Sequence, residues 1–342
     1  MSQYKVAVVG AGEVGEELLK VLKSLRFPAS EIKILARSAR VQNIDGDDYN
    51  VYATTPEAFD DVDIAFFAGT EGAKGASQIY GWEAVKRGCF VIDNGDDYRM
   101  DPRVPLVVPE VNGDALREHQ GFVANPNCST IQMVHALAPL NAISKIKRIV
   151  VTTFQSVSGT GRDAKKELDE QIHAYIKGEE MPIRNYPYQI FCNVIPQISS
   201  LKSEFEGYYG EEIKMIKETR KILSNPGIQV SATCVRVPVF RAHSEAVNVE
   251  FEDEITVDQA REAISNWDGL ELIDDPAESK YPMPLFAEGK DPTYVGRIRK
   301  DTSNPNTLDM WVVADNIRKG AALNSVQTAL KAIDMGLVKP KA

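Results

Sequence analysis

The first third of the chain alternates short apolar runs with amphipathic segments. Residues 5–9 (KVAVV) form a β-branched run that stops at Gly10, which is typical of a buried parallel strand. Apolar residues then recur at helical spacing, at Val14, Leu18, Val21, Leu22 and Leu25. Similar patterns predict strands at residues 31–35, 62–67 and 90–92 and a helix at residues 76–87. Repeats of strand, helix and strand up to about residue 127 predict an α/β fold, a doubly wound sheet of the Rossmann type.

The second half of the chain follows a different pattern. Polar, helix-like segments are found at residues 164–177 and 211–223, and the second is closed by Asn225-Pro226-Gly227. Strands are predicted at residues 149–154, 228–240 and 246–251. This half therefore reads as an α+β domain with a largely antiparallel sheet. An alanine-rich helix is predicted at residues 316–335, with an apolar stripe suited to packing on a sheet.

Composition and charge narrow the class of protein. With 342 residues, of which 26% are charged, the chain is typical of a globular protein with two domains. The net charge is −10 and no basic stripe is present, so we expect no nucleic-acid partner. The longest apolar runs are strand-length, so we expect no membrane association. The cysteines form no CxxC pair, which argues against a metal site and a disulfide framework and favours the cytoplasm.

A glycine-rich turn follows the first predicted strand and opens the first helix. Gly10-Ala11-Gly12-Glu13-Val14-Gly15 fits the pattern G-x-G-x-x-G in the context that dinucleotide binding requires. Gly10 permits a tight turn, Gly12 lets the backbone approach a pyrophosphate, and Gly15 lets the helix pack closely on the strand. Glu13 and Val14 begin the helix whose N-terminus meets the phosphates. The alternative is an ordinary glycine turn of an α/β protein.

The end of the second predicted strand indicates which dinucleotide binds. Enzymes that use NAD usually carry a carboxylate there to hold the ribose 2′-hydroxyl. This chain has Arg37, Ser38 and Arg40 instead, and arginine binds phosphate through a forked geometry. The pattern favours NADP, unless Arg37 and Arg40 are solvated surface charges.

Cys128 has the sequence context of a nucleophile. It stands in Asn125-Pro126-Asn127-Cys128-Ser129-Thr130, directly before an apolar helix pattern, so we expect it at a helix N-terminus. The helix dipole favours a thiolate there. A single cysteine is more often structural, but a polar setting at the end of the dinucleotide-binding half favours the catalytic interpretation. The remaining cysteines, which lie in apolar segments and which we interpret as structural, are Cys89, Cys192 and Cys234.

His243 and Arg236 are two further candidates. His243 lies on a predicted turn between two strands, a suitable place for a general base, although a surface histidine is the alternative. Arg236 interrupts an apolar strand, and a buried guanidinium needs an anionic partner. That partner is either a substrate carboxylate or an acidic residue on a neighbouring strand.

Taken together, these residues resemble the bacterial type of the aspartate-semialdehyde dehydrogenase family, over almost the whole chain. The stretches that carry the resemblance are 108–112 (VPEVN), 125–130 (NPNCST), 155–159 (QSVSG), 193–197 (NVIPQ), 236–239 (RVPV), 243–245 (HSE) and 311–323. The resemblance implies an NADP-binding domain of residues 1–127 plus 316–342. It also implies a catalytic and dimerisation domain of residues 128–315, and a homodimer.

The resemblance also implies roles for individual residues. Cys128 matches the nucleophile, His243 the acid/base catalyst, and Gln155 a residue that orients the substrate. Substrate contacts are implied for Arg236 with the α-carboxylate, Glu211 with the amino group, and Lys214, Arg99 and Asn127 with phosphate. Cofactor contacts are implied for Asn316, near the nicotinamide, and for the turn Ser158-Gly159. From the residues alone, Glu211 and Lys214 would be a solvated i,i+3 ion pair.

The implied reaction is the reversible reduction of aspartyl phosphate to aspartate semialdehyde through a cysteine thioester. It belongs to lysine, threonine, methionine and isoleucine biosynthesis, and its substrates are small molecules. The alternatives are an enzyme similar to N-acetylglutamyl-phosphate reductase and a non-catalytic NADP-binding paralogue. Two departures from the family pattern are a first glycine loop one residue shorter and the acidic tripeptide Gly95-Asp96-Asp97 just before Arg99. Asp96 and Asp97 either turn outward into solvent or pair with Arg99 and weaken phosphate binding.

Overall fold

The computed structural model describes residues 3–68 and 75–341 of the chain. The chain divides into two compact units. The first consists of Met1–Asn127 and Ala321–Ala342, and the second is Cys128–Gly320. Among the described residues, no helix has the length and apolar character needed to cross a bilayer.

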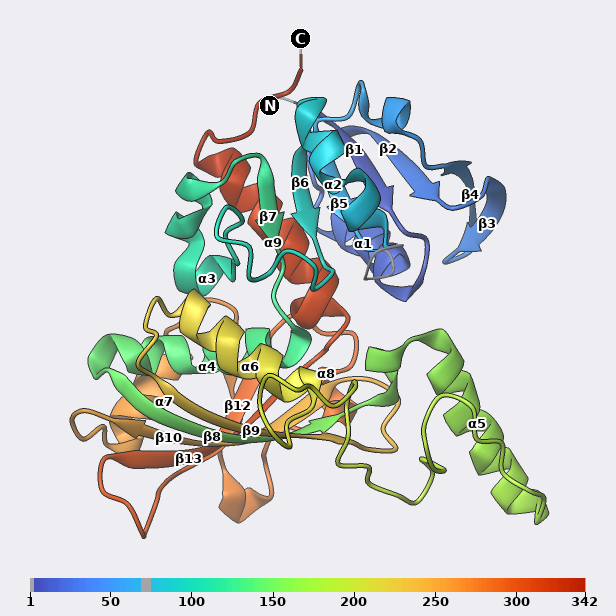
Figure 1. Cartoon of the computed structure of the whole chain (residues 1–342). Helices are drawn as coiled ribbons and strands as arrows, with labels where there is room; N and C mark the ends of the chain where they lie inside the picture. The colour runs from blue at the N-terminus through green and yellow to red at the C-terminus, as the bar shows by residue number, and fades with distance from the viewer. Residues whose placement is uncertain (1–2, 69–74, 342) are drawn as a thin grey trace. The chain divides into compact units, whose positions relative to one another are not determined.

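The first unit is built on a seven-stranded sheet with the order β3-β4-β2-β1-β5-β6-β7 (Figure 1). Its strands are β1 (Tyr4–Val9), β2 (Ala29–Ala36), β3 (Arg40–Ile44), β4 (Asp47–Ala53), β5 (Ile64–Phe67), β6 (Phe90–Asp93) and β7 (Phe122–Ala124). All neighbouring strands run parallel except β3 and β4, which form an antiparallel hairpin at the edge. The parallel sheet predicted from the apolar runs is therefore confirmed.

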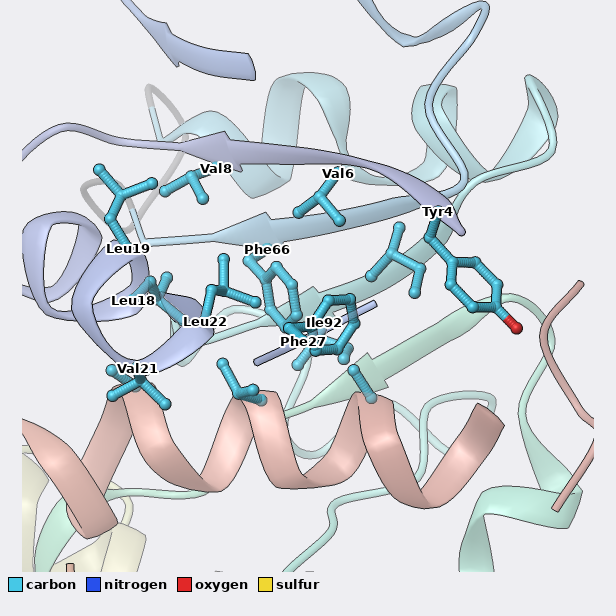
Figure 2. Close-up of a cluster of buried hydrophobic side chains, with 14 of the residues drawn as sticks. Tyr4, Val6, Val8, Leu18, Leu19, Val21, Leu22, Phe27, Phe66 and Ile92 are labelled. Atoms are coloured by element: carbon cyan, nitrogen blue, oxygen red, sulfur yellow. The ribbon is translucent and has the colours of Figure 1, made fainter. Parts of the chain in front are cut away.

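Helices cover both faces of this sheet because successive side chains of a strand point to opposite sides. Phe66 belongs to a core cluster formed with helices α1 (Glu13–Ser24) and α9 (Leu323–Asp334). Figure 2 shows the α1 side chains Leu18 and Leu22 directed toward Phe66 in this cluster. The next residue, Phe67, stacks on Phe59 on the other face, where helix α2 (Ala76–Lys86) packs. This arrangement confirms the doubly wound fold.

The second unit is built on a six-stranded mixed sheet with the order β11-β12-β13-β10-β8-β9 (Figure 1). Its strands are β8 (Ile146–Gln155), β9 (Gln229–Arg236), β10 (His243–Phe251), β11 (Leu270–Leu272), β12 (Thr293–Lys300) and β13 (Thr307–Ala314). Three of the neighbouring pairs are antiparallel and two are parallel. Three helices pack on it, namely α4 (Cys128–Ile143), α6 (Gly210–Ile222) and α7 (Val257–Ser265). The predicted α+β architecture is confirmed.

Shorter elements and one long helix complete the two units. In the first unit they are η1 (Pro56–Phe59), α3 (Pro109–Asn112) and η2 (Gly113–Glu118). In the second they are η3 (Val157–Thr160), α5 (Arg162–Lys177), η4 (Pro276–Glu278) and α8 (Pro284–Ala287). The π-helical turn η5 (Arg318–Ala322) spans the boundary at Gly320. Helix α5 and η3 share a small apolar core that contains Val157 and Leu168.

Two element boundaries and one missed hairpin are the main differences from the prediction. The strand predicted at residues 228–240 ends at Arg236, because its partner β8 ends at Gln155 and Pro238 offers no backbone donor. The last helix begins with a π-helical turn rather than at residue 316. The β3–β4 hairpin was not predicted, because most of its residues are polar and exposed and leave little apolar alternation.

Candidate active site

Four strand ends meet at one edge of the second sheet. Parallel strands β8 and β9 finish together, with Gln155 registered against Arg236. The antiparallel neighbour β10 begins at the same edge, where His243 is registered against Ala314, the last residue of β13. The topology of the sheet therefore brings together residues that are distant in the sequence. It also corrects the placement of His243, which opens strand β10 and is fully buried, so the surface alternative is wrong.

The ring of His243 has a defined environment. Its Nδ1 atom accepts hydrogen bonds from the backbone N–H of Ser156 and the Ser156 hydroxyl, both at 3.1 Å. Because a backbone N–H can only donate, the neutral ring must carry its proton on Nε2. Burial, and then the nearby guanidinium of Arg236, lower the pKa of His243 to about 3. The ring is therefore neutral and presents an N–H group at Nε2.

Asn316 is held by a network that includes the turn after β8. Its Oδ1 atom accepts hydrogen bonds from the Ser158 hydroxyl and from the backbone N–H of Ala242. The Ser156 hydroxyl oxygen, whose single proton goes to His243 Nδ1, lies 3.3 Å from the same Oδ1 atom. Because the amide oxygen makes these contacts, the Nδ2 group of Asn316 points away from them. The second residue of the predicted cofactor turn, Gly159, lies so close that a β-carbon there would be 3.0 Å from Arg236 Nη1 and 3.3 Å from His243 Nε2.

Three buried donor atoms at this edge have no acceptor within the described part of the chain. They are Nε of Arg236, Nε2 of His243 and Nδ2 of Asn316. Nη1 of Arg236 donates to the Ser156 carbonyl, and among the described residues no acidic side chain forms an ion pair with this guanidinium. A buried donor without an acceptor is costly, about 1–3 kcal/mol. Such atoms are therefore expected to face a ligand that is rich in oxygen.

An acidic residue lies beside these donors. The Gln155 amide donates to Oε1 of Glu211 at 3.1 Å, and Glu211 is nearly buried on helix α6. Nζ of Lys214 lies 3.8 Å from Glu211 Oε2, one turn along the same helix. The pair is an i,i+3 ion pair, but the burial of Glu211 rules out the solvated pair that the residues alone suggested.

Cys128 is the first residue of helix α4, as the sequence predicted, and its side chain is partly exposed. Gly320, in the π-helical turn η5, packs directly on it. A β-carbon at Gly320 would lie 2.8 Å from Cβ of Cys128, so no larger residue fits without moving one of the two segments. Turns of π-helix inside helices are frequent at functional sites.

The other cysteines have different environments. Burial raises the pKa of the Cys89 thiol to about 11 and that of Cys234 well above its usual range. Such thiols stay protonated and unreactive, so their structural interpretation agrees with the geometry. Cys192 is exposed, and its interpretation as an apolar structural residue is wrong.

The glycine turn of the first unit lines a cavity of about 780 Å³. Its lining contains Gly10, Gly12, Arg37, Ser38 and Arg40, five of the residues predicted to bind the cofactor. Gly10 has a φ of 114°, which glycine adopts readily. A β-carbon at Gly15 would lie 1.8 Å from the Gly10 carbonyl oxygen, whereas one at Gly12 would meet no protein atom. Gly15 is thus required by packing, and the space above Gly12 is open. Glu13 and Val14 form the first turn of α1.

Arg99 and its neighbours also belong to the first unit. The nearly buried guanidinium donates to the carbonyl oxygens of Asn125 and Asn94. Asp93, at the end of β6, is a further acid near Arg99 that was not singled out from the sequence, and burial raises its pKa to about 6. Asp97 accepts a hydrogen bond from Ser77 at 3.2 Å and, like Asp96, is half-buried, so the tripeptide is not a fully solvated turn. Asn127, the other phosphate candidate of this unit, is buried just before Cys128.

Comparison with known proteins decides the family. Two family models match, "Semialdehyde dehydrogenase, NAD binding domain" over residues 5–119 and "Semialdehyde dehydrogenase, dimerisation domain" over residues 137–319. The aspartate-semialdehyde dehydrogenase of Aquifex aeolicus is 47% identical over 98% of this chain and 99% of its own length. The Bacillus subtilis enzyme is 46% identical over 97% and 98% of the two chains.

This chain belongs to the aspartate-semialdehyde dehydrogenase family. A crystal structure of aspartate semialdehyde dehydrogenase II from Vibrio cholerae has a TM-score of 0.92 and 41% identity, covering 97% of this chain and 99% of that one. A second crystal structure of that protein, complexed with ASA, has the same TM-score and 40% identity, with coverage of 98% and 99%. The family resemblance, the oxidoreductase class and the dinucleotide-binding domain inferred from the sequence are therefore confirmed.

Three residues of the site were not identified as functional from the sequence. Ser156 fixes the tautomer of His243, Gly320 packs on Cys128, and buried Asp315 accepts from the backbone of Ile317 and Arg318 to shape η5. Only Gly320 carries a usable signal, a glycine inside a helix-like pattern. The other two act through backbone contacts, which a single sequence does not display.

Proposed function

We propose that this protein is an NADP-dependent aspartate-semialdehyde dehydrogenase with Cys128 as nucleophile and His243 as acid/base catalyst. The observation that carries the proposal is the group of three buried donors, on Arg236, His243 and Asn316, that lack an acceptor among residues 3–68 and 75–341. The substrate offers matching acceptors, a carboxylate and a carbonyl oxygen. Relatives at 46–47% identity that bear the name of this activity support the assignment.

The substrate contacts follow from charge. Arg236 would bind the α-carboxylate through its free Nε atom, because a buried guanidinium is stabilised by an anion. Glu211, held by Gln155 and close to Lys214, would accept the substrate ammonium group. Gln155 thereby orients the substrate indirectly. Lys214, Arg99 and Asn127 are the proposed phosphate ligands.

Two residues would carry the chemistry, Cys128 by bonding to the substrate and His243 by acting on its oxygen. The Cys128 thiolate would add to the aldehyde carbon, and the resulting oxygen would receive a hydrogen bond from Nε2 of His243. NADP, when bound, supplies the hydride acceptor that allows oxidation of this adduct to a thioester. Phosphate would then attack the thioester carbon, and the Cys128 sulfur would leave as thiolate with release of aspartyl phosphate. In the other direction the same residues reduce the acyl phosphate.

The residues of the first unit fit NADP. The cavity of about 780 Å³ joins the glycine turn to Arg37, Ser38 and Arg40 at the end of β2. Gly12 and the first turn of α1 would contact the pyrophosphate, and the two arginines the 2′-phosphate. In the second unit, Ser158, Gly159 and Asn316 would hold the nicotinamide end.

The double variant Arg37→Ala/Arg40→Ala is expected to lose most of the preference for NADP over NAD. Each arginine offers a charge-assisted contact that only the 2′-phosphate can use. kcat/KM should fall about 10- to 100-fold with NADP and change little with NAD. Arg26→Ala, an arginine outside the cavity, is the matched control. An unchanged ratio of the two kcat/KM values would show that Arg37 and Arg40 are only surface charges.

The double variant Asp96→Ser/Asp97→Ala is expected to lower KM for phosphate more than KM for aspartate semialdehyde. A carboxylate about 4 Å from phosphate is repelled by roughly 4 kcal/mol at an effective dielectric constant of 20. Solvent screening of these half-buried groups reduces that figure, so the expected change is a few-fold. Initial rates at varied phosphate measure it. An unchanged phosphate KM would mean that neither carboxylate faces the anion.

The proposed domain division assigns residues 1–127 and 316–342 to NADP binding and residues 128–315 to catalysis and dimerisation. The family model named for dimerisation, which matches residues 137–319, supports a homodimer. Sedimentation of the purified protein tests this assignment, since a monomer at micromolar concentration would contradict it.

Progress curves with aspartate semialdehyde, phosphate and NADP test the proposed function. We expect phosphate-dependent formation of NADPH. Turnover of N-acetylglutamate semialdehyde at a higher kcat/KM would favour the related reductase activity, and no turnover of either aldehyde would favour a non-catalytic paralogue. Absence of phosphate dependence would exclude an acyl phosphate product.

A further inference from the structure

A second row of buried polar residues lies directly behind the site on the same face of the sheet. Its members are two residues from the site residues on each strand, Thr153 behind Gln155, Cys234 behind Arg236 and Glu245 behind His243. Side chains at i and i+2 of a strand share one face. All three members of this row are essentially inaccessible to solvent.

Glu245 is the unusual member of this row. It is fully buried, and neither carboxylate oxygen has a well-aligned hydrogen-bond partner in the described chain. An ionised carboxylate in such a place requires a cation or several donors. The neighbours on the adjoining strands, Thr153 of β8 and Val312 of β13, carry no charge.

Apart from His243 and Arg236 of the site itself, the titratable groups that act on this row are acids. Cys234 on β9 has its pKa raised first by burial and then by Glu211, Glu212 and Glu245. Burial also raises the pKa of Glu245 well above its usual range, and hydrogen bonding to Gln132 works in the opposite direction. Negative charges gathered in one buried row disfavour each other's ionisation.

The side chain within reach of Glu245 comes from the helix that carries the nucleophile. Gln132 is fully buried on α4, one turn after Cys128 and on the same side of the helix. Its Oε1 atom has no donor in the part of the chain that the structure describes, and its Nε2 group makes a long contact of 3.5 Å with the His243 carbonyl oxygen. A carboxylic acid and a primary amide satisfy each other with two reciprocal hydrogen bonds, whereas a carboxylate cannot donate to Oε1.

We propose that Glu245 is a neutral carboxylic acid whose paired hydrogen bonds with Gln132 fix helix α4, and with it Cys128, against the start of strand β10 at His243. Glu245 is thus a positioning residue. It touches no substrate, and it acts through the two elements that carry the nucleophile and the acid/base catalyst. The activity readouts of this inference rest on the proposed function, whereas the stability and infrared readouts do not.

The pH dependence of stability separates the neutral acid from an ionised one. A folded-state pKa above the unfolded value of about 4.3 gives stability that is complete below that pH and is lost as pH rises toward the folded pKa. Glu245→Gln cannot ionise and avoids this loss. The difference in melting temperature between Glu245→Gln and the wild type should therefore grow in favour of the variant by on the order of 2 °C per pH unit as pH rises from about 5 toward the folded-state pKa.

Infrared spectroscopy reports the protonation state directly. The difference spectrum between wild type and Glu245→Gln at neutral pH should contain the carbonyl band of a protonated carboxylic acid. The matched control is Glu250→Gln on the same strand, because Glu250 pairs with Lys147 at 2.7 Å, which lowers its pKa. The control should lack the band and should show no gain in melting temperature at higher pH.

Activity tests the positioning role. Glu245→Gln keeps a neutral side chain that can pair with Gln132, so kcat should stay within about threefold with an unshifted pH profile. Glu245→Leu leaves Gln132 unpaired and should lower kcat about tenfold or more, with KM for NADP little changed.

Loss of activity in Glu245→Gln together with an absent acid band would overturn the proposal. If Glu245→Leu does not fold, the infrared band and the stability of Glu245→Gln still decide it. If the wild type turns over no aldehyde, these two readouts still test the protonation of Glu245, and only the proposed function fails.

Discussion

Cys128→Ala is expected to abolish turnover of aspartate semialdehyde. The variant has no sulfur to form the thioester, so the covalent route is closed, and removing a nucleophile from a catalytic unit costs up to about a million-fold in kcat. Single-turnover measurements check the result, and intact-protein mass spectrometry of the enzyme mixed with substrate and NADP should find no acyl adduct. Alanine keeps the β-carbon that lies against Gly320 and is smaller than cysteine, so the variant fits the site without steric conflict.

The matched control is Cys89→Ala, which removes a thiol from another part of the chain. Cys89 is buried and its thiol has a pKa raised to about 11, so it should be unreactive toward the aldehyde. The control variant should retain kcat within about threefold, and any loss should appear in stability instead. Turnover by Cys128→Ala at a rate close to wild type would remove Cys128 from the mechanism.

Patterns of apolar residues predicted most of the first unit. The strands near residues 5–9, 62–67 and 90–92 and the helix near 76–87 are found within a few residues of their predicted bounds. They were predictable because a buried parallel strand appears as a continuous apolar run, and a helix on the sheet shows apolar residues at every third or fourth position. The edge hairpin β3–β4 was missed for the opposite reason, since solvent reaches most of its side chains and leaves no clear apolar pattern.

The site was predictable as a set of residues but not as a geometry. Gln155, Arg236 and His243 were identified by motif, yet their proximity depends on strands β8, β9 and β10 ending or beginning at one edge. Register between distant strands is set by packing of the whole sheet, which a single sequence does not encode locally. The contacts of Ser156 with His243 were invisible for the same reason, because they join residues 87 positions apart.

Glu245 illustrates a different limit. In the sequence it is one more acidic residue next to His243-Ser244, and acidic residues usually lie at the surface. Only the structure places it on the inward face of β10 with no access to solvent. The same strand carries Glu250 on a part-exposed position with a lysine partner, because residues 245 and 250 point to opposite faces of the strand.

His243→Ala is expected to lower kcat about 100- to 1,000-fold, the usual cost of removing a donor that stabilises a developing oxyanion. His243→Asn should lose less than His243→Ala, since an amide can still donate a hydrogen bond from a similar position. Initial rates at saturating aspartate semialdehyde, phosphate and NADP measure both variants. The control is His173→Ala, an exposed helical residue whose removal should alter kcat less than about twofold.

The same residue should make the folded protein sensitive to acid. The folded-state pKa of about 3 lies below the unfolded value near 6.5, so His243 takes up a proton on unfolding. Its contribution to stability is complete above about pH 6.5 and is lost as pH falls toward about 3, on the order of 1 kcal/mol per pH unit. His243→Asn should therefore unfold at a lower pH than the wild type in an acid titration followed by circular dichroism.

The structure also predicts that the kcat/KM profile has no inflection near pH 6.5 from the His243 ring, because the free enzyme keeps it neutral. A wild-type inflection at that pH that disappears in His243→Asn would contradict the buried, neutral histidine and, with it, the Nε2 donor that the mechanism uses.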